Sequence, residues 1–547
     1  MRALLCIALL LAAACTQSSQ GSSQQAPASQ NQPRRGGILR VATLGSLPTV
    51  LHPYPQPQHN TTPLGDESTL MFSGLIDLDY NTLDYIADPR TSLATALPTI
   101  SDDGRTFTFT IRGDAKWSDG QPITSADFLF AWQNASNPDN DFVGLDTLER
   151  IQSYTAPDSR TIQVTLDQQY ARFVAIGTAA GIGPVPMHIW QGKPWYDAQG
   201  NPEITKPTVV SGPYMPTELT ADHHTYQRNP NWWGKQPNLD QVVFVSATPT
   251  TVLELLKTRQ VEWAENFPPS QLDDAQSASN ANVVRWVGAV GSYRELDFNL
   301  QRPQLADKRV REALVRAINR QDLVQFENNL AVPQPGLFPS GNTKWLNTSV
   351  ESYDYDIDRS RQLLQDAGYH LDSGVLRDPS GNQLTLDIIW PTTSEPRGKE
   401  ATYIQQQWKQ LGINVSVTGL EFAAYVDKFQ RQRDFDVGMG SSLAGSPDPD
   451  EIKSEIKTGG LQNASGYSNP RVDMLLDQGA IEQDDAKRKA IYDETQKLVT
   501  DDLPFFNTIT LENVTAFDKK VGGVSPSKGG DILTENNMQI LDWYLTE

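Results

Sequence analysis

Hydrophobic and polar residues alternate with a period of two in several short segments of the chain. In TFTFTIR (106–112), three apolar residues are each followed by a polar one, and TIQVTL (161–166) repeats this alternation. An alternation of this kind is typical of a strand with one buried face. We therefore predict strands over both segments.

Other segments place their apolar residues three and four positions apart, which is the spacing of a helix with one buried face. KRVREALVRAINR (308–320) follows Asp307 with such a stripe, and RSRQLLQDAG follows Asp358 and ends at Gly368, a helix stop. Thr124 and Asp127 form a capping box ahead of FLFAWQN. Because helices and strands alternate throughout the chain, we predict an α/β fold.

The first 35 residues differ from the rest in composition. One positive residue, Arg2, precedes an apolar run and small residues up to Cys15, so residues 1–14 are predicted to be a secretory signal peptide. LLAAAC resembles a bacterial lipobox, which predicts lipidation of Cys15 and anchoring at the membrane in the periplasm or at the cell surface. Simple secretion is the alternative. Residues 15–35 are rich in Ser, Gln and Pro and are expected to form a flexible tether.

The length and composition of the chain limit the number of domains and the classes of ligand that we expect. A chain of 547 residues is too long for one hydrophobic core and predicts two or three domains. The 45 basic and 66 acidic residues give a net charge of −21, which disfavours binding to nucleic acid. The two cysteines, Cys6 and Cys15, lie in the leader, and the six histidines show no metal-binding spacing. We therefore expect no metal and no cofactor. Nothing in the sequence singles out a catalytic residue, although a hydrolase using two carboxylates stays open.

Seven segments occur together in an order that resembles the bacterial extracellular solute-binding proteins, the family that includes the oligopeptide- and dipeptide-binding proteins. The segments are SLATALPTISDDGRTFTFTIRGDAKWSDGQPITSADFLFAWQ, SGPYM, YQRNPNWWG, LDFNLQRPQLADKRVREALVRAINRQDLV, YDIDRSRQLLQDAGY, GINVSVTGLEF and RDFDVGMG. The resemblance covers nearly all of residues 36–547. It implies a monomeric α/β receptor of the type II periplasmic-binding-protein fold, peptide-binding cluster, in which two lobes close on a peptide or another small polar ligand and deliver it to an ABC permease and its ATPase.

The resemblance also implies a division of the chain. Lobe I would comprise residues 36–80, 208–295 and 505–547, a small second domain residues 81–207, and lobe II residues 296–504. The hinge strands are expected near Pro207–Tyr214 and Leu503–Phe506.

Two charged anchors of the peptide-binding relatives are replaced in this chain. Counting from Phe435 and Asp436, the position of the aspartate that captures a peptide amine falls on Gly445, and that of an arginine for the carboxylate falls on Met439. Asp448, three residues further on, is an alternative amine partner. Without these anchors a short zwitterionic peptide would lose charge-assisted hydrogen bonds, so longer peptides or uncharged ligands such as oligosaccharides are favoured.

Further ligand contacts follow from the same resemblance. They are expected at Asn60, Thr61 and Thr62 in a loop of lobe I, at Phe422 in GLEF, and at Gly440, Ser441 and Ser442 at a strand end. Small residues there would let a ligand approach the backbone closely. A receptor that senses its ligand without feeding a permease is the remaining alternative.

Overall fold

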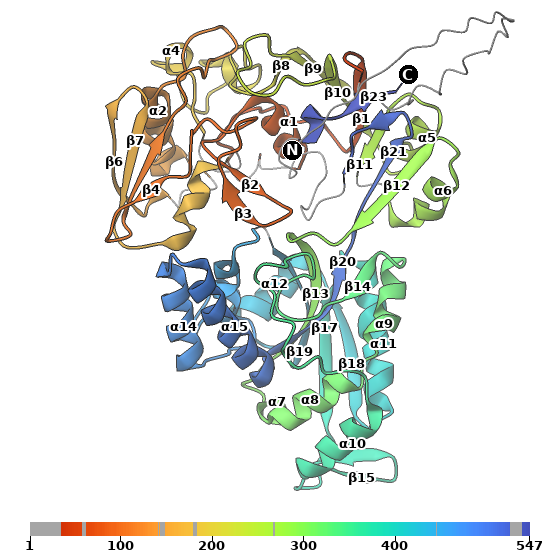
Figure 1. The fold of residues 1–547 in the computed structure, drawn as a ribbon. Helices are drawn as coiled ribbons and strands as arrows, with labels where there is room; N and C mark the ends of the chain where they lie inside the picture. The colour runs from red at the N-terminus through yellow and green to blue at the C-terminus, as the bar shows by residue number, and fades with distance from the viewer. Residues whose placement is uncertain are drawn as a thin grey trace, which may run out of the picture.

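The computed structural model describes residues 34–56, 59, 62–140, 142, 148–178, 183–265, 268–444, 446–525 and 539–546. Two large mixed sheets and one smaller sheet organise these residues into an upper and a lower part (Figure 1). Within the described ranges, no helix combines the length and apolar character that crossing a membrane requires.

Lobe I is built around a seven-stranded sheet. In spatial order its strands are β12 (Ala281–Trp286), β21 (Asn513–Asp518), β11 (Trp263–Glu265), β1 (Ile38–Leu44), β10 (Gln241–Ala247), β9 (His223–Arg228) and β8 (Tyr214–Leu219). The accompanying elements are α1 (Thr62–Met71), α5 (Val252–Lys257), α6 (Leu272–Ser277) and the two-stranded β22 (Val521–Gly522) and β23 (Tyr544–Leu545). Its core contains the stacked rings of Trp263, Phe517 and Trp543.

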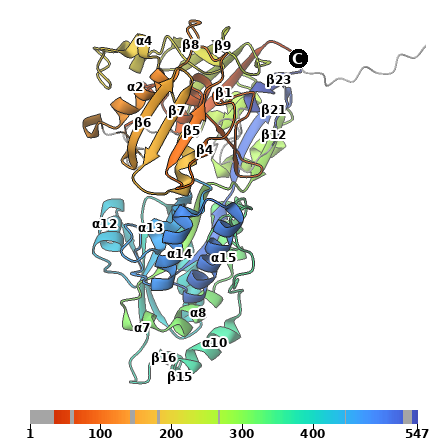
Figure 2. The same cartoon turned by 60° about the vertical axis from the view of Figure 1, so that its left-hand side comes forward.

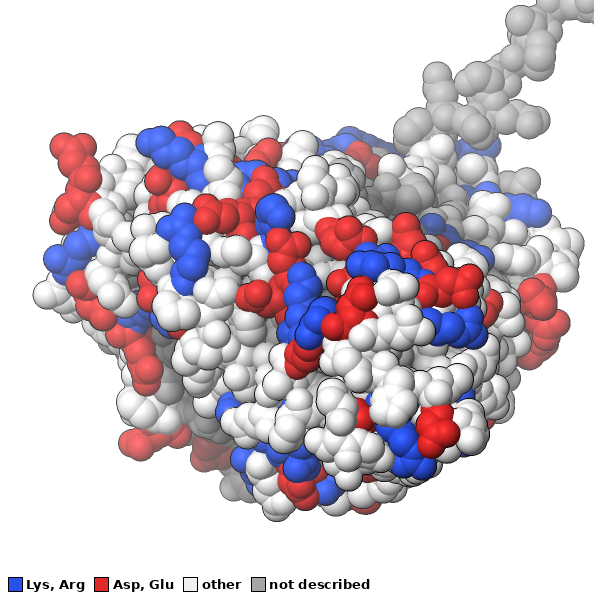
Figure 3. Space-filling view, turned by 90° about the horizontal axis from the view of Figure 1, so that it is seen from below, with Lys and Arg blue, Asp and Glu red and all other residues white. Residues whose placement is uncertain are grey.

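Lobe II is built around a six-stranded sheet in the order β14 (Ala331–Pro333), β20 (Phe505–Leu511), β13 (Gly291–Phe298), β19 (Val437–Ala444), β17 (Thr385–Pro391) and β18 (Asn414–Leu420). Its α-helices are α7 (Pro303–Ala306), α8 (Lys308–Arg316), α9 (Arg320–Leu323), α10 (Ile357–Asp366), α11 (Glu395–Lys409), α12 (Phe422–Val426), α13 (Lys453–Ile456), α14 (Pro470–Ile481) and α15 (Asp485–Asp502). The hairpin of β15 (His370–Asp372) and β16 (Val375–Arg377) lies beyond α10. On the face seen from below, acidic and basic side chains are interspersed, so the negative net charge forms no single patch there (Figure 3).

Local sequence signals explain where several helices begin and end. Asp307 caps α8 by accepting a hydrogen bond from the backbone N–H of Arg309. The cap of α10 is Asp356, which accepts from the N–H of Arg359 at 2.8 Å, so the predicted start at Asp358 is two residues late. The predicted stop at Gly368 is confirmed by its left-handed φ of +94°.

The segment predicted to be the small domain, residues 81–207, contains a four-stranded antiparallel sheet in the order β4 (Thr99–Ile100), β5 (Thr106–Thr110), β7 (Thr161–Leu166) and β6 (Ile151–Asp158). Both strands predicted from alternation are present, and β5 ends two residues earlier than expected. The helices α2 (Ser125–Ala135) and α4 (Met187–Trp190) belong to this domain, and β2 (Asp77–Asp79) pairs with β3 (Asp84–Ile86) at its entrance. The predicted capping box at α2 is confirmed.

The small domain is joined to lobe I by a shared core. Tyr54, Leu75 and Ile76 from the lobe I segments are buried among the aromatic residues of the small domain. His52 links the two through its ring, since the Tyr54 N–H donates to Nδ1 at 2.9 Å and Nε2 lies 2.9 Å from the Trp195 carbonyl oxygen. The two parts therefore form one packed unit.

The chain crosses between the two large sheets twice, at 287–290 from β12 to β13 and at Glu512 from β20 to β21. Residues 291–295 and 505–511 thus pair in the sheet of lobe II, although the predicted division assigned them to lobe I. The hinge predicted at Leu503–Phe506 lies before and at the start of β20, inside lobe II, and Pro207–Tyr214 leads from the small domain into β8 of lobe I. The resemblance located strands along the chain, but only their pairing shows to which sheet each belongs.

Candidate ligand-binding site

In lobe I, the carboxyl ends of the parallel strands face lobe II. Strands β11 and β12 both run antiparallel to β21, and β1 runs parallel to β10 and β11, so β1, β10, β11 and β12 point the same way. The chain leaves β12 for lobe II. The carboxyl ends of all four strands therefore lie at the edge nearest lobe II.

Lobe II presents the same kind of edge to lobe I. Strand β13 enters from lobe I at Gly291, which lies opposite Ala444, the last residue of the antiparallel β19. Strands β17 and β18 run parallel to β19, so their carboxyl ends lie at this edge too. In open α/β sheets, ligands bind outside the carboxyl ends of the strands. The candidate site is therefore the seam between the two edges (Figure 1).

Some of the predicted contact residues lie at these edges. A single residue separates the end of β18 from Phe422, which begins α12 and has 52% of its surface exposed. Thr62 begins α1 in the segment that follows β1. Ser442 pairs with Tyr293 near the Gly291 end of β13. Asn60, Thr61 and Gly445 lie outside the described residues, as does Cys15.

The side chain of Met439 lies in the core of lobe II, with 1% of its surface exposed. Alternation along β19 places it on the opposite face from Gly438 and Gly440. The Met439 carbonyl accepts a hydrogen bond from the Tyr425 hydroxyl at 2.9 Å. The position at which the family resemblance implied a carboxylate contact is therefore a packing position in this chain.

Gly440 faces the acidic side chains of β13. A Cβ atom at residue 440 would lie 2.5 Å from the Asp297 Oδ2 atom and 2.5 Å from Glu295 Cγ. At Gly438, a Cβ atom would lie 2.4 Å from the Phe429 ring. Both glycines are thus required by close packing within lobe II, whether or not a ligand approaches them.

Asp448 is buried and already paired. Its two carboxylate oxygens accept hydrogen bonds from Arg488 at 2.7 and 2.8 Å, and 4% of each residue is exposed. Burial opposes ionisation, but the hydrogen bonds and charge of Arg488 hold the pKa of Asp448 below its ordinary value. A ligand amine would have to displace Arg488, so the geometry does not favour Asp448 as the substitute amine anchor.

Behind β19, a buried ionic cluster lies between the sheet and α11. Arg294 donates from Nε to Glu327 at 2.9 Å and from Nη1 to the Ser441 hydroxyl at 3.0 Å. Glu400, on α11, is fully buried in the same cluster, and this burial raises its pKa to about 8 against the opposing charge of Arg294. Sequence reasoning missed this cluster, because charged residues are ordinarily exposed and no local pattern marks these as buried.

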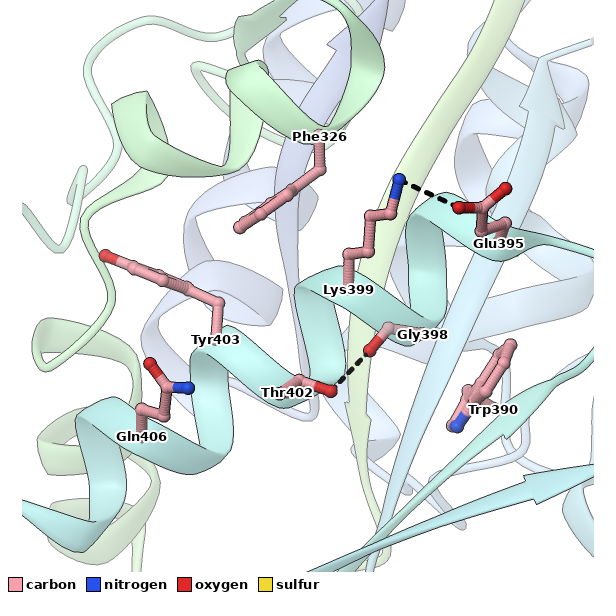
Figure 4. A pocket seen from close by; sticks show the side chains of 8 residues that line it. All are labelled: Phe326, Trp390, Glu395, Gly398, Lys399, Thr402, Tyr403 and Gln406. Atoms are coloured by element: carbon pink, nitrogen blue, oxygen red, sulfur yellow. Dashed lines mark hydrogen bonds and ion pairs between the residues drawn. The ribbon is translucent and has the colours of Figure 1, made fainter.

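A cavity of about 570 Å³ lies on the outer face of α11 (Figure 4). It is lined by Phe326, Trp390, Glu395, Gly398, Lys399, Thr402, Tyr403 and Gln406. Lys399 pairs with Glu395 at 2.9 Å beside it. Every lining residue belongs to lobe II, so this cavity is distinct from the seam between the lobes.

Comparisons with known proteins agree with this architecture. The sequence model of bacterial extracellular solute-binding proteins, family 5 (Middle), matches residues 88–461. The dipeptide-binding protein DppE of Bacillus subtilis (strain 168) is 24% identical over 446 residues, which cover 76% of this chain and 78% of DppE. The probable deoxycholate-binding periplasmic protein YgiS of Escherichia coli (strain K12) is 25% identical over 449 residues, covering 78% of this chain and 80% of YgiS.

Solved structures show the same fold. The ABC transporter substrate-binding protein CtaP of Listeria monocytogenes aligns with a TM-score of 0.76 at 23% identity, covering 94% of this chain and 100% of CtaP. The oligopeptide-binding protein AppA of Bacillus subtilis, in complex with a nonapeptide, aligns with a TM-score of 0.67 at 20% identity and covers 94% of this chain and 100% of its own. The predicted two-lobed α/β fold and the family resemblance are confirmed.

Proposed function

The chain belongs to family 5 of the bacterial extracellular solute-binding proteins, and from this membership we propose that it is the substrate-binding component of an ABC importer that captures peptides. The observation that carries the proposal is the arrangement of the two sheets, whose parallel strands direct their carboxyl ends toward one seam. A ligand held between two lobes loses water on both sides, which strengthens the hydrogen bonds that it makes. This gain favours closure of the lobes on a ligand.

The ligand proposed is an extended peptide of more than two or three residues. Met439 is packed in the core and Asp448 is engaged by Arg488, so neither supplies a free charge for a peptide terminus. Each missing charge-assisted hydrogen bond costs about 1.5 to 3 kcal/mol, or roughly ten- to a hundredfold in affinity. A longer peptide held through its backbone, as in strand addition to a sheet, depends less on its termini. The solved relative that holds a nonapeptide supports this choice.

A second candidate is a non-peptide ligand such as an oligosaccharide. The half-exposed Phe422 at the seam offers an aromatic face on which the apolar face of a sugar stacks. The relative named as a probable deoxycholate-binding protein supports ligand diversity among similar chains.

The proposal also covers the location, the oligomeric state and the partners of the protein. We place it outside the cytoplasm as a monomer, held at the membrane by a lipid on Cys15 and a tether over residues 15–35, and without catalysis of its own. It would deliver its ligand to a permease and an ATPase. The predicted contacts at Asn60, Thr61, Thr62, Phe422, Gly440, Ser441, Ser442 and Gly445 belong to this proposal.

Thermal unfolding in the presence of ligand libraries tests the proposal. A ligand at a hundred times its Kd stabilises the folded state by about 2.7 kcal/mol, which is readily measured as a rise in Tm. We expect nonapeptides to raise Tm more than tripeptides. Acetylation and amidation of the peptide ends should change the rise little. Stabilisation by oligosaccharides alone would select the second candidate, and no stabilisation by either class at millimolar concentration would count against both.

Incubating the same libraries with the protein and analysing them by mass spectrometry tests the absence of catalysis. Cleaved peptide or glycan products would establish a hydrolase.

A further inference from the structure

The segment that follows β19 connects lobe II to the small domain through acidic side chains. It comprises Asp448, the cap of the short 3-10 helix Pro449–Ile452, and two further acids, Asp450 and Glu451. Figure 2 shows the four-stranded sheet of the small domain standing over α14 and α15, beside which this segment packs. The acids of the segment therefore lie at a contact between two parts of the fold.

Two side chains of the small domain reach this segment. Arg172 Nη2 lies 2.9 Å from Glu451 Oε2, and 30% of each side chain is exposed. The Tyr170 hydroxyl donates to Asp450 Oδ2 at 3.4 Å, and the guanidinium of Arg150 lies over the Tyr170 ring at 4.3 Å. The contact thus combines an ion pair and a hydrogen bond at a partly exposed seam.

A third contact crosses the same seam, and in this one lobe II supplies the cation and the small domain supplies the carboxylate. Lys344 of lobe II places its ammonium nitrogen 2.6 Å from Asp84 Oδ1 in β3 and 2.6 Å from Asp485 Oδ2 in α15. It is therefore shared between the small domain and its own lobe. When Asp84 is removed, Lys344 retains Asp485.

The lobe II side of these contacts is held in place by lobe II itself. Arg488 binds both oxygens of Asp448, and the Asp448 carboxylate accepts from the backbone N–H of Asp450 at 2.9 Å. The Tyr492 hydroxyl donates to Asp450 Oδ1 at 3.0 Å. Because lobe II positions its own acids, the small domain can leave and return without refolding the segment.

The small domain shares a core with lobe I, whereas its contacts with Glu451 and Lys344 of lobe II are made through side chains. The chain crossings at 287–290 and Glu512 are separate from them. Rotation of the lobes about the crossings would therefore separate Arg172 from Glu451 and Lys344 from Asp84.

We propose that Asp84, Tyr170 and Arg172 of the small domain and Lys344, Asp450 and Glu451 of lobe II form a polar clasp in the absence of ligand. It stabilises the arrangement of the lobes in which these contacts are made, which we call closed. Opening exchanges these contacts for contacts with water. The clasp therefore sets how much of the ligand-free protein is closed, and it makes that fraction sensitive to salt. Removing one partly exposed ion pair shifts such an equilibrium by about two- to fivefold, and removing two shifts it by about tenfold.

Fluorescence resonance energy transfer on the full chain tests the clasp. Replacing Cys6 and Cys15 by serine leaves no thiol in the chain, so dyes can be attached to cysteines introduced at the exposed positions Ala198 and Lys409. We expect Arg172→Gln combined with Lys344→Gln to lower the ligand-free closed-to-open ratio about tenfold at 20 mM NaCl. The charge exchange Arg172→Glu with Glu451→Arg should recover most of the shift caused by Arg172→Gln alone.

A matched control removes an ion pair away from the seam. Lys497 pairs with Asp501 at 2.9 Å on α15, and Lys497→Gln should leave the ratio unchanged. Raising NaCl to 500 mM should open the unmodified chain and leave the double variant unaffected.

Equal energy-transfer distributions for the unmodified chain and a folded double variant at low salt would overturn the proposal. If that variant fails to fold, Asp84→Asn with Glu451→Gln removes the same two pairs from their acidic ends. An unchanged distribution in that folded variant would overturn the proposal equally.

Discussion

Replacing Glu400 by glutamine is expected to make the protein more stable than the unmodified chain at pH 8 and about equally stable at pH 5. Glu400 is fully buried, and its pKa is raised to about 8 from an ordinary value of 4.5. Burial is the largest cause, the charge of Arg294 opposes it, and the nearby Glu327 adds to it. Between pH 4.5 and 8 the folded protein therefore holds a proton that the unfolded chain releases.

The sign and size of the effect follow from this difference. Because the pKa is raised in the folded state, the stabilisation is full below the unfolded pKa and is lost as the pH rises through the folded pKa. The loss is at most about 1.4 kcal/mol per pH unit, which gives about 3 to 4 kcal/mol between pH 5 and pH 8 from this carboxyl alone. Glutamine has the same shape and does not titrate, so the variant lacks this loss.

Urea unfolding followed by tryptophan fluorescence at pH 5, 6, 7 and 8 measures the difference. We expect the two chains to be similar in stability at pH 5 and the variant to gain about 3 to 4 kcal/mol on the unmodified chain by pH 8. Glu395→Gln on the same helix is the control, since the exposed Glu395 has a lowered pKa and is ionised throughout this range. The reasoning is refuted if Glu400→Gln leaves the pH dependence unchanged or destabilises the protein more at pH 8 than at pH 5.

Three further substitutions test the packing that surrounds the seam. Burial lowers the pKa of His52 to about 3. The free energy of unfolding should therefore fall by about 1.4 kcal/mol per pH unit as the pH drops from 6.5 toward 3, because the unfolded chain binds a proton that the folded His52 does not. His52→Gln should give a shallower decline in Tm over this pH range. Arg488→Met leaves Asp448 buried and unpaired and should cost about 3 to 5 kcal/mol in urea unfolding, with partial recovery on adding Asp448→Asn. Gly440→Ala should lower the free energy of unfolding by about 1 to 3 kcal/mol, because the added Cβ meets two acidic side chains. Gly65→Ala is the control and should cause no loss of stability, since Gly65 lies on a helix with open space around its Cβ position. Equal effects of the two substitutions would contradict this packing.

The elements that the sequence predicted are those fixed by neighbours along the chain. The strands at 106–110 and 161–166 follow alternation, and the start of α8 follows the cap at Asp307. Strand β13 could not be recognised in this way, because Arg294, Glu295 and Asp297 are polar yet all are buried. A central strand covered on both faces does not alternate, and its charges find partners only after folding.

The sequence predicted positions for ligand contacts, but it did not predict which of the side chains there are packed in the core or already paired. Counting along the strand placed Met439 at an anchor position, but a strand alternates its faces, and residue 439 falls on the core face. Asp448 was the remaining acid nearby, and its partner Arg488 is forty residues away in sequence, on another helix. No local pattern joins the two, so only the tertiary structure shows that the acid is occupied.

The segment from Gly438 to Glu451 contains residues with two different roles, whereas the sequence suggested only ligand contacts for this segment. Gly438 and Gly440 are required by the close packing of Phe429 and β13, so these two glycines are explained without a ligand. Its acids face Arg488 and the small domain, so they hold the seam together. These acids follow the carboxyl end of β19 by four to seven residues, and a ligand is proposed to bind at that strand end, so we expect a bound ligand to shift the clasp. Binding and lobe closure are then coupled through one short segment, and a variant that weakens the clasp should weaken ligand binding without touching the ligand.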